Sequence, residues 1–275
     1  MPEADKRNLP DPQEDLTLLL EAAREAGEIA MGYFGKDPQV WIKEGSSPVS
    51  EADYAADRYL RETLLNARPG YGWLSEETAD DLKRLDAPRT FVVDPIDGTR
   101  AFIAGNPTWC VSIAVVEEGR SLAGVLDCPA KGEIFSATTC GGAFLDGKRI
   151  AVRTAGSSPE IAGPKDMIDE LPKDLIARAS KVGYVPSLAY RIAMIAAGRI
   201  DASFVKPDSH DWDLAAAALI LEQAGGKLIA EDGLPPRFAD EMIRHGALVA
   251  GSNELLDELY AVIAKPEGRA PHFPV

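Results

Sequence analysis

The segment DPIDGT at residues 94–99 places two carboxylates directly after an apolar run at residues 90–93. Because the end of a buried strand holds side chains rigidly, Asp94 and Asp97 are suited to bind a hard divalent cation, which prefers oxygen ligands. Pro95 fixes its own φ and favours an extended conformation for Asp94. These residue types and their spacing predict a metal site at the end of the strand.

The second half of the same segment suits a bound anion. Gly98 allows the backbone to approach a ligand closely, and the amides of Gly98 and Thr99 could donate to a phosphate. The segment could equally be an ordinary turn between a strand and a helix. Phosphatases with an aspartyl nucleophile also carry Asp-Gly-Thr, but their nucleophile and acid are two residues apart. Asp94 and Asp97 are three apart, which disfavours that mechanism.

Three further acidic positions could belong to the same site, and each has a plain structural alternative. Asp53 ends the segment SEAD, which has the form of a helix capping box. Glu76 follows a short apolar pair and could be a solvated surface residue. Asp213 begins an alanine-rich helix, where the helix dipole favours a negative charge. Their joint occurrence with DPIDGT favours a carboxylate metal cluster.

Three motifs in this order resemble those of the inositol monophosphatase family, the lithium-sensitive, Mg²⁺-dependent phosphatases. They are SEE at residues 75–77, where the family has Gly-Glu-Glu, DPIDGT at 94–99, and WD at 212–213 ahead of Gly225-Gly226. The resemblance spans residues 15–265, with Ser75 in place of the usual Gly and Ser50 in place of a common Thr. It implies an α/β (α+β) fold, a layered αβαβα sandwich.

The resemblance also implies a role for each site residue. Two or three Mg²⁺ ions, for which Mn²⁺ could substitute, would be ligated by Glu76, Asp94, the carbonyl of Ile96, Asp97 and Asp213. The catalytic residues would be Asp53 and Thr99, which orient and deprotonate the attacking water, together with Glu76. Substrate binding is assigned to Asp97, Gly98, Thr99, Ser187, Lys206 and Asp213. The expected reaction is hydrolysis of a small phosphate monoester, such as inositol monophosphate, by metal-activated water.

The substrate is less closely defined. Inositol-specific relatives have a Glu several residues before Trp-Asp, whereas residues 204–210 contain none and place Lys206 at or next to that position. A Lys206 that faces the site would favour a second anionic group, as in 3′(2′),5′-bisphosphate nucleotides; an exposed lysine at a strand end is the alternative. The loop VPSL at 185–188 departs from the family's Gly-Ser/Thr-Ala-Ala. Histidinol phosphate is a further candidate.

Other classes of function find less support. A P-loop motif is absent, and none of the cysteines, Cys110, Cys128 and Cys140, lies in a phosphate-cradling loop. A regulatory or binding member of the family could keep the fold without activity. The retained carboxylates argue against this, because unused clustered charges repel each other and cost stability.

The elements that must position these residues can be predicted from hydrophobic periodicity. Helices are expected from residue 16 to 34, from 50 to 67 and at 187–197, 211–224 and 252–263. Apolar runs separated by turn residues predict strands at 90–93, 111–116, 122–126, 133–137, 143–145, 200–205, 227–230 and 247–250. We expect an N-terminal α+β domain at 1–154, with an antiparallel sheet and most metal ligands. A smaller α/β domain at 155–275 would supply Asp213 and the specificity loop.

The composition of the chain limits the classes of partner and the cellular location that we expect. The 275-residue chain has a net charge of −15 and no cluster of Lys and Arg, so nucleic-acid binding is not expected. No run approaches the about 18 apolar residues of a membrane span. Acidic residues stand where a signal peptide would be basic, and three cysteines cannot all pair, which predicts a cytoplasmic protein. The expected partner is a small phosphorylated metabolite, and the family resemblance implies a homodimer.

Overall fold

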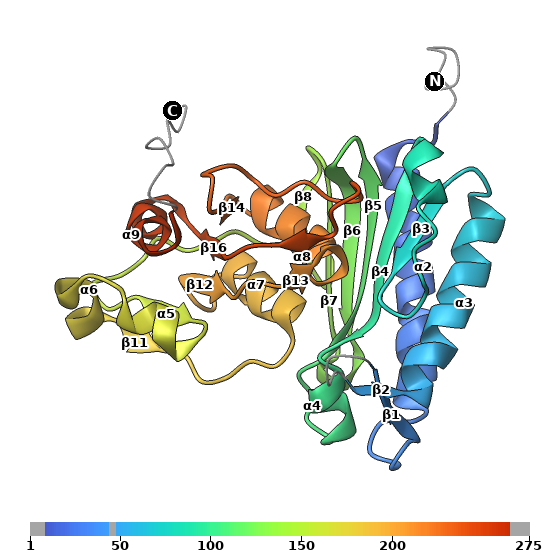
Figure 1. The fold of residues 1–275 in the computed structure, drawn as a ribbon, viewed down its shortest axis with the longest axis horizontal. Helices are drawn as coiled ribbons and strands as arrows, with labels where there is room; N and C mark the ends of the chain where they lie inside the picture. Colours follow the sequence, from blue (N-terminus) through green and yellow to red (C-terminus); the bar gives the residue numbers. More distant parts are fainter. Residues whose placement is uncertain (1–8, 44–47, 265–275) are drawn as a thin grey trace.

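The computed structural model describes residues 9–43 and 48–264 of the chain. Helices and sheets alternate in five layers, which confirms the predicted αβαβα sandwich (Figure 1). The outer layer on one side holds α2 (Pro12–Met31) and α3 (Glu51–Ala67). The middle layer holds α7 (Leu188–Ala196) and α8 (Asp211–Gln223). The outer layer on the other side holds α5 (Lys165–Asp169), α6 (Lys173–Arg178) and α9 (Asn253–Ile263).

The larger sheet has seven strands in sequence order. They are β3 (Gly72–Ser75), β4 (Thr90–Asp97), β5 (Cys110–Glu117), β6 (Arg120–Cys128), β7 (Glu133–Thr138), β8 (Gly142–Leu145) and β9 (Lys148–Arg149). All neighbours are antiparallel except β3 and β4, which confirms the predicted hairpins. Strand β4 continues past the predicted end at residue 93. Its pairing with β5 shifts register between Asp94 and Asp97, where Pro95 lacks the amide that a regular ladder needs.

The smaller sheet has the order β11-β10-β12-β16-β14. Its strands are β11 (Ser180–Lys181), β10 (Glu160–Ala162), β12 (Ala202–Val205), β16 (Leu248–Gly251) and β14 (Lys227–Ala230). The sequence analysis located the last three, which are apolar runs, but missed β10, β11, α5 and α6, whose two to six residues contain no sustained apolar run. The expected domain boundary at 154/155 falls between β9 and β10, and the division itself stays a prediction.

Three apolar cores hold the layers together. One joins α2 and α3 to the larger sheet, the second joins the same sheet to α7 and α8, and the third joins the smaller sheet to α5, α6 and α9. Helix α8 is apolar on nearly all sides because it lies between two sheets. Its alanines allow a close approach, and a Cβ on Gly124 of β6 would lie 3.1 Å from Cα of Ala216. No helix in the described part of the chain is both long and apolar enough to cross a membrane.

The remaining elements are short and lie outside the two main sheets. They are the two-stranded sheets β1 (Val40–Ile42) with β2 (Pro48–Ser50) and β13 (Ser209–His210) with β15 (Arg244–His245), the helix α4 (Thr99–Ile103), and the 3-10 turns Lys83–Asp86 and Pro129–Lys131. Helix α4 starts directly after β4, and its N-cap Gly98 has φ +97°. A Cβ there would lie 3.2 Å from the carbonyl oxygen of Thr108, so both the backbone conformation and the space favour glycine.

Candidate active site

Three carboxylates from two layers meet at the end of β4. Asp94, Asp97 and Asp213 each place one oxygen within 4.8 Å of the others. Asp94 and Asp97 are 1% and 4% exposed at the end of β4, whereas Asp213, in the first turn of α8, keeps 21% of its side chain exposed. The packing of α8 against the larger sheet therefore assembles the cluster that the motifs predicted.

The electrostatics of this cluster favour a bound cation. Loss of water is the largest cause that raises the pKa of each of the three carboxyls, to about 6 for Asp97 and well above the usual value for Asp94 and Asp213. The negative charge of Glu76 raises all three pKa values further. Such a group of oxygen donors fits Mg²⁺, because a hard divalent cation both ligates to carboxylates and cancels their repulsion.

A cavity of about 580 Å³ opens over the cluster. Its wall includes seven of the predicted site residues: Glu76, Asp94, Asp97, Gly98, Thr99, Lys206 and Asp213. The other three, Asp53, Ile96 and Ser187, are fully buried and lie outside this lining. The structure thus places seven of the predicted residues on the cavity wall and three buried outside this lining.

Asp53 and Thr99 contact each other, as the resemblance implied. Oγ1 of Thr99 lies 3.2 Å from Oδ1 of Asp53 and 3.1 Å from the carbonyl oxygen of Ile96. The capping box predicted for Asp53 is also present, since Oδ2 accepts from the amide of Ser50 at 2.8 Å and from its hydroxyl. Burial raises the pKa of Asp53 to about 6 against the opposing effect of the Ser50 hydrogen bonds. Asp213 likewise accepts from the N-cap amide of its helix, that of His210, at 2.7 Å.

Ser187 supports Asp97 from behind the cavity wall. Its hydroxyl donates to Oδ2 of Asp97, and the amide of Ala189 donates to the same oxygen at 2.7 Å. The amide of Leu188 donates to Oδ1 at 3.3 Å. Asp97 therefore sits at the N-terminus of α7, where backbone amides favour an anion. The predicted contact of Ser187 with substrate finds no support in this arrangement, because the residue is fully buried and its hydroxyl is engaged.

Lys43, which the sequence analysis did not select, follows β1 directly and pairs with Glu76 and Glu77. Its Nζ lies 3.1 Å from Oε1 of Glu76 and 2.5 Å from Oε1 of Glu77. Burial alone would lower the pKa of Lys43, but the two glutamates outweigh burial and raise it. Burial raises the pKa of Glu77 to about 7 despite this partner. Lys43 thus supplies a positive charge where the metal cluster is expected.

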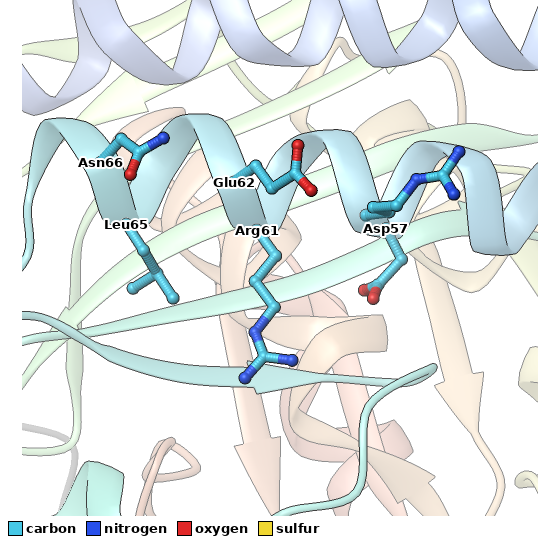
Figure 2. Close-up of a pocket in the computed structure, with 6 residues that line it drawn as sticks. Asp57, Arg61, Glu62, Leu65 and Asn66 are labelled. Carbon is cyan, nitrogen blue, oxygen red and sulfur yellow. The ribbon is translucent and has the colours of Figure 1, made fainter.

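Asp57, one turn after Asp53, fixes the segment that carries Glu76. It accepts hydrogen bonds from the hydroxyl of Ser75 and, at 3.0 Å, from that of Thr78. The serine that replaces the family's glycine therefore ties β3 to α3. Figure 2 shows Asp57 projecting from the same side of α3 as Arg61 and Leu65, beside a smaller cavity that shares no lining residue with the acidic one.

Three cationic side chains also line the acidic cavity: Arg100, Arg191 and Lys206. Lys206 follows β12 directly and is exposed. Arg191, from α7, was not selected from the sequence because its position within an apolar helix carried no recognised motif. One of its terminal nitrogens donates to the carbonyl oxygen of Phe204 at 3.2 Å. Lys206 is exposed at the end of a strand, as the alternative held. It also lies beside the site, as the sequence predicted.

Comparison with known proteins agrees with this geometry. The model of the inositol monophosphatase family matches residues 11–267. An inositol-1-monophosphatase of Rhizobium meliloti is 33% identical and covers 91% of this chain and 96% of its own. A histidinol-phosphatase of Chlorobaculum parvum is 32% identical and covers 92% and 98%.

Solved structures share the fold over the same extent. The extragenic suppressor protein SuhB of Bartonella henselae superposes with a TM-score of 0.80 at 29% identity, and the match covers 92% of this chain and 99% of that one. The IMPase of Thermotoga maritima superposes with a TM-score of 0.78 at 26% identity, over 91% and 96% of the two chains. These matches span the larger sheet, the middle helices and the smaller sheet alike.

Proposed function

Because the chain belongs to the inositol monophosphatase family, we propose that it is a Mg²⁺-dependent phosphatase that hydrolyses small phosphate monoesters. The observation that carries the proposal is the cluster of Asp94, Asp97 and Asp213 in the wall of a cavity that Gly98 and Thr99 also line. This arrangement supports both parts of the reaction, because it offers oxygen ligands for cations and amides at a helix N-terminus for an anion.

The residues proposed to hold two or three Mg²⁺ ions are Glu76, Asp94, Asp97, Asp213 and the carbonyl of Ile96, with Mn²⁺ as an acceptable substitute. When bound, Mg²⁺ would neutralise phosphate charge and lower the pKa of a coordinated water. The side chains around the cluster then orient the reactants. Asp53 holds the Thr99 hydroxyl and accepts a proton from the attacking water through it, while the amides of Gly98 and Thr99 hold the phosphate.

A direct assay tests the proposal. The purified protein with millimolar Mg²⁺ is expected to release inorganic phosphate from a panel that includes inositol 1-phosphate, histidinol phosphate and adenosine 3′,5′-bisphosphate. Removal of the metal with a chelator should abolish release, and Li⁺ at tens of millimolar should inhibit it. No phosphate release from any monoester would favour the alternative, a member of the family with a regulatory or binding role.

The expected homodimer and the cytoplasmic location stay predictions. The family resemblance supports the first, and the composition of the chain supports the second. Light scattering of the purified protein tests the oligomeric state, where a mass of one chain would contradict the homodimer.

A further inference from the structure

Arg191 keeps hydrogen-bonding capacity unused at the cavity wall. A guanidinium has five N–H donors. Nη2 donates to Phe204, whereas Nε is buried without a hydrogen-bond partner. None of the ion pairs found among residues 9–43 and 48–264 includes Arg191. The charge of the Asp97 carboxylate offsets part of the cost of burying Arg191, although the two groups form no ion pair. The guanidinium therefore still suits an anion that arrives from the cavity.

Ser209 adds a second unused polar group to the same wall. The residue is 5% exposed, and its Oγ is buried without a hydrogen-bond partner. Because β13 pairs with β15 through Ser209 and His245, the backbone holds this hydroxyl in place. Two buried polar side chains, Arg191 and Ser209, therefore line one cavity with no partner for the atoms concerned.

These groups border the acidic cluster from the side of α7 and β12. Arg191 extends from α7 to the end of β12, Lys206 follows β12 directly, and Ser209 begins β13, four residues before Asp213. Asp94 and Asp97 approach the cavity from β4. Asp208 also lines the cavity from the β12–β13 connection, but it is exposed to solvent, where its charge is screened.

We propose that Arg191, Ser209 and Lys206 form an anion subsite for a second charged group of the substrate, a phosphate or a carboxylate on the part that leaves. The inference rests on the proposed phosphatase function and narrows its substrate class. The planar fork of a guanidinium binds two oxygens of either anion at once, and the serine hydroxyl donates a third hydrogen bond. A volume of about 580 Å³ leaves room for a doubly charged small metabolite.

Matched substrates test the subsite. Adenosine 3′,5′-bisphosphate is compared with adenosine 3′-phosphate, and 2-phosphoglycerate with glycerol 2-phosphate, so that each pair differs by one anionic group. We expect kcat/KM to be about tenfold or more higher for the doubly charged member of at least one pair. The preferred pair identifies the second anion as phosphate or carboxylate.

Variants assign the preference to these residues. Arg191→Gln should lower kcat/KM about 10- to 100-fold for the doubly charged substrate and less than about threefold for its partner, whereas Arg191→Lys should keep part of the preference. Lys206→Met, at an exposed position that leaves folding intact, should reduce the same ratio. Arg58→Gln, on the exposed side of α3, is the matched control and should change neither value.

The outcomes separate the two proposals. Phosphate release from none of the four substrates or the wider panel would overturn the phosphatase function. Release without preference for the doubly charged member of either pair would overturn the subsite alone. An equal loss on both substrates in Arg191→Gln, with the ratio also unchanged in Lys206→Met, would show that Arg191 has a structural role and would likewise overturn the subsite.

Discussion

Oγ1 of Thr99 lies 3.2 Å from Oδ1 of Asp53, although 46 positions separate the two residues in the chain. The contact joins the first turn of α3 to the first turn of α4, so that a buried carboxylate holds a hydroxyl on the cavity wall. Asp53 is itself held by two hydrogen bonds from Ser50. A proton acceptor fixed in this way can serve general-base catalysis.

Replacement of Asp53 should therefore reduce turnover more than binding. We expect Asp53→Asn and Thr99→Val each to lower kcat by about 10²- to 10⁴-fold with little change in KM, because the acceptor or its link to water is lost. If the two residues act as a unit, kcat of the double variant should be only slightly lower than kcat of either single variant. Steady-state kinetics measure this, with Glu62→Gln on the exposed side of α3 as control. An Asp53→Asn enzyme with more than half the wild-type kcat contradicts the assignment.

Metal binding should stabilise the folded protein. A ligand at 100 times its Kd adds about 2.7 kcal/mol to the free energy of unfolding, which corresponds to a rise in Tm of about 5 °C or more. Thermal unfolding with increasing Mg²⁺ should show this rise for the wild type. Asp213→Asn should remove most of it, and the exposed control Asp81→Asn should not. An undiminished rise in Asp213→Asn would exclude Asp213 as a ligand.

Without metal, the acidic cluster should make stability fall as pH rises. The folded-state pKa values of Asp53 and Asp97 are about 6, raised from 3.8 chiefly by burial. The unfolded chain therefore binds fewer protons between about pH 4 and 6, and the free energy of unfolding falls with pH across that window. With metal removed by a chelator, the Tm of the wild type should fall between pH 4.5 and about 7. The Tm of Asp97→Asn should fall less over the same range. A steeper fall in Asp97→Asn would contradict the sign of this linkage.

Lys43 should compete with metal for Glu76. Because its ammonium group lies 3.1 Å from Oε1 of Glu76, a metal that takes this oxygen must displace it or share it. Lys43→Gln should lower the Mg²⁺ concentration for half-maximal activity about threefold or more, whereas Lys43→Arg should leave it nearly unchanged. Activity titrated with Mg²⁺ measures this. A higher Mg²⁺ concentration for half-maximal activity in Lys43→Gln would contradict this competition and indicate that Lys43 positions the ligands.

Variants of Ser187 should show whether its hydroxyl supports the proposed metal ligand Asp97 or contacts the substrate. Because its hydroxyl donates to Oδ2 of Asp97, Ser187→Ala should raise the Kd for Mg²⁺ about 10-fold, as losses of hydrogen bonds behind metal ligands do. At saturating Mg²⁺ the KM for substrate should change little, and Ser187→Thr should restore metal affinity. A raised KM with unchanged metal affinity would instead support the substrate contact expected from the sequence.

Local features of the site could be predicted from the sequence because their partners lie close in the chain. The capping box predicted at Asp53 joins residues three apart, Asp213 begins α8 as expected from the helix dipole, and periodicity over ten or more residues located α2, α3, α7 and α8. Elements as short as β10 and α5 have too few residues for such a signal. The order of the SEE, DPIDGT and WD motifs was sufficient to identify the family, and with it the αβαβα layers.

The sequence by itself therefore determined the family, the acidic motifs, and the elements α3, β4 and α8 that carry Asp53, Asp94, Asp97 and Asp213. It did not predict β3, which leads into Glu76, or α4, which begins at Thr99. The tertiary structure alone decided which other side chains reach those motifs. Lys43 meets Glu76, Ser187 meets Asp97, and Arg191 enters the cavity with an unpaired Nε. Each contact depends on how separate layers pack across three apolar cores. Because spacing along the chain does not encode that packing, Lys43 and Arg191 became recognisable only in the structure. Ser187 was selected from the sequence, but only the structure showed that its hydroxyl donates to Asp97.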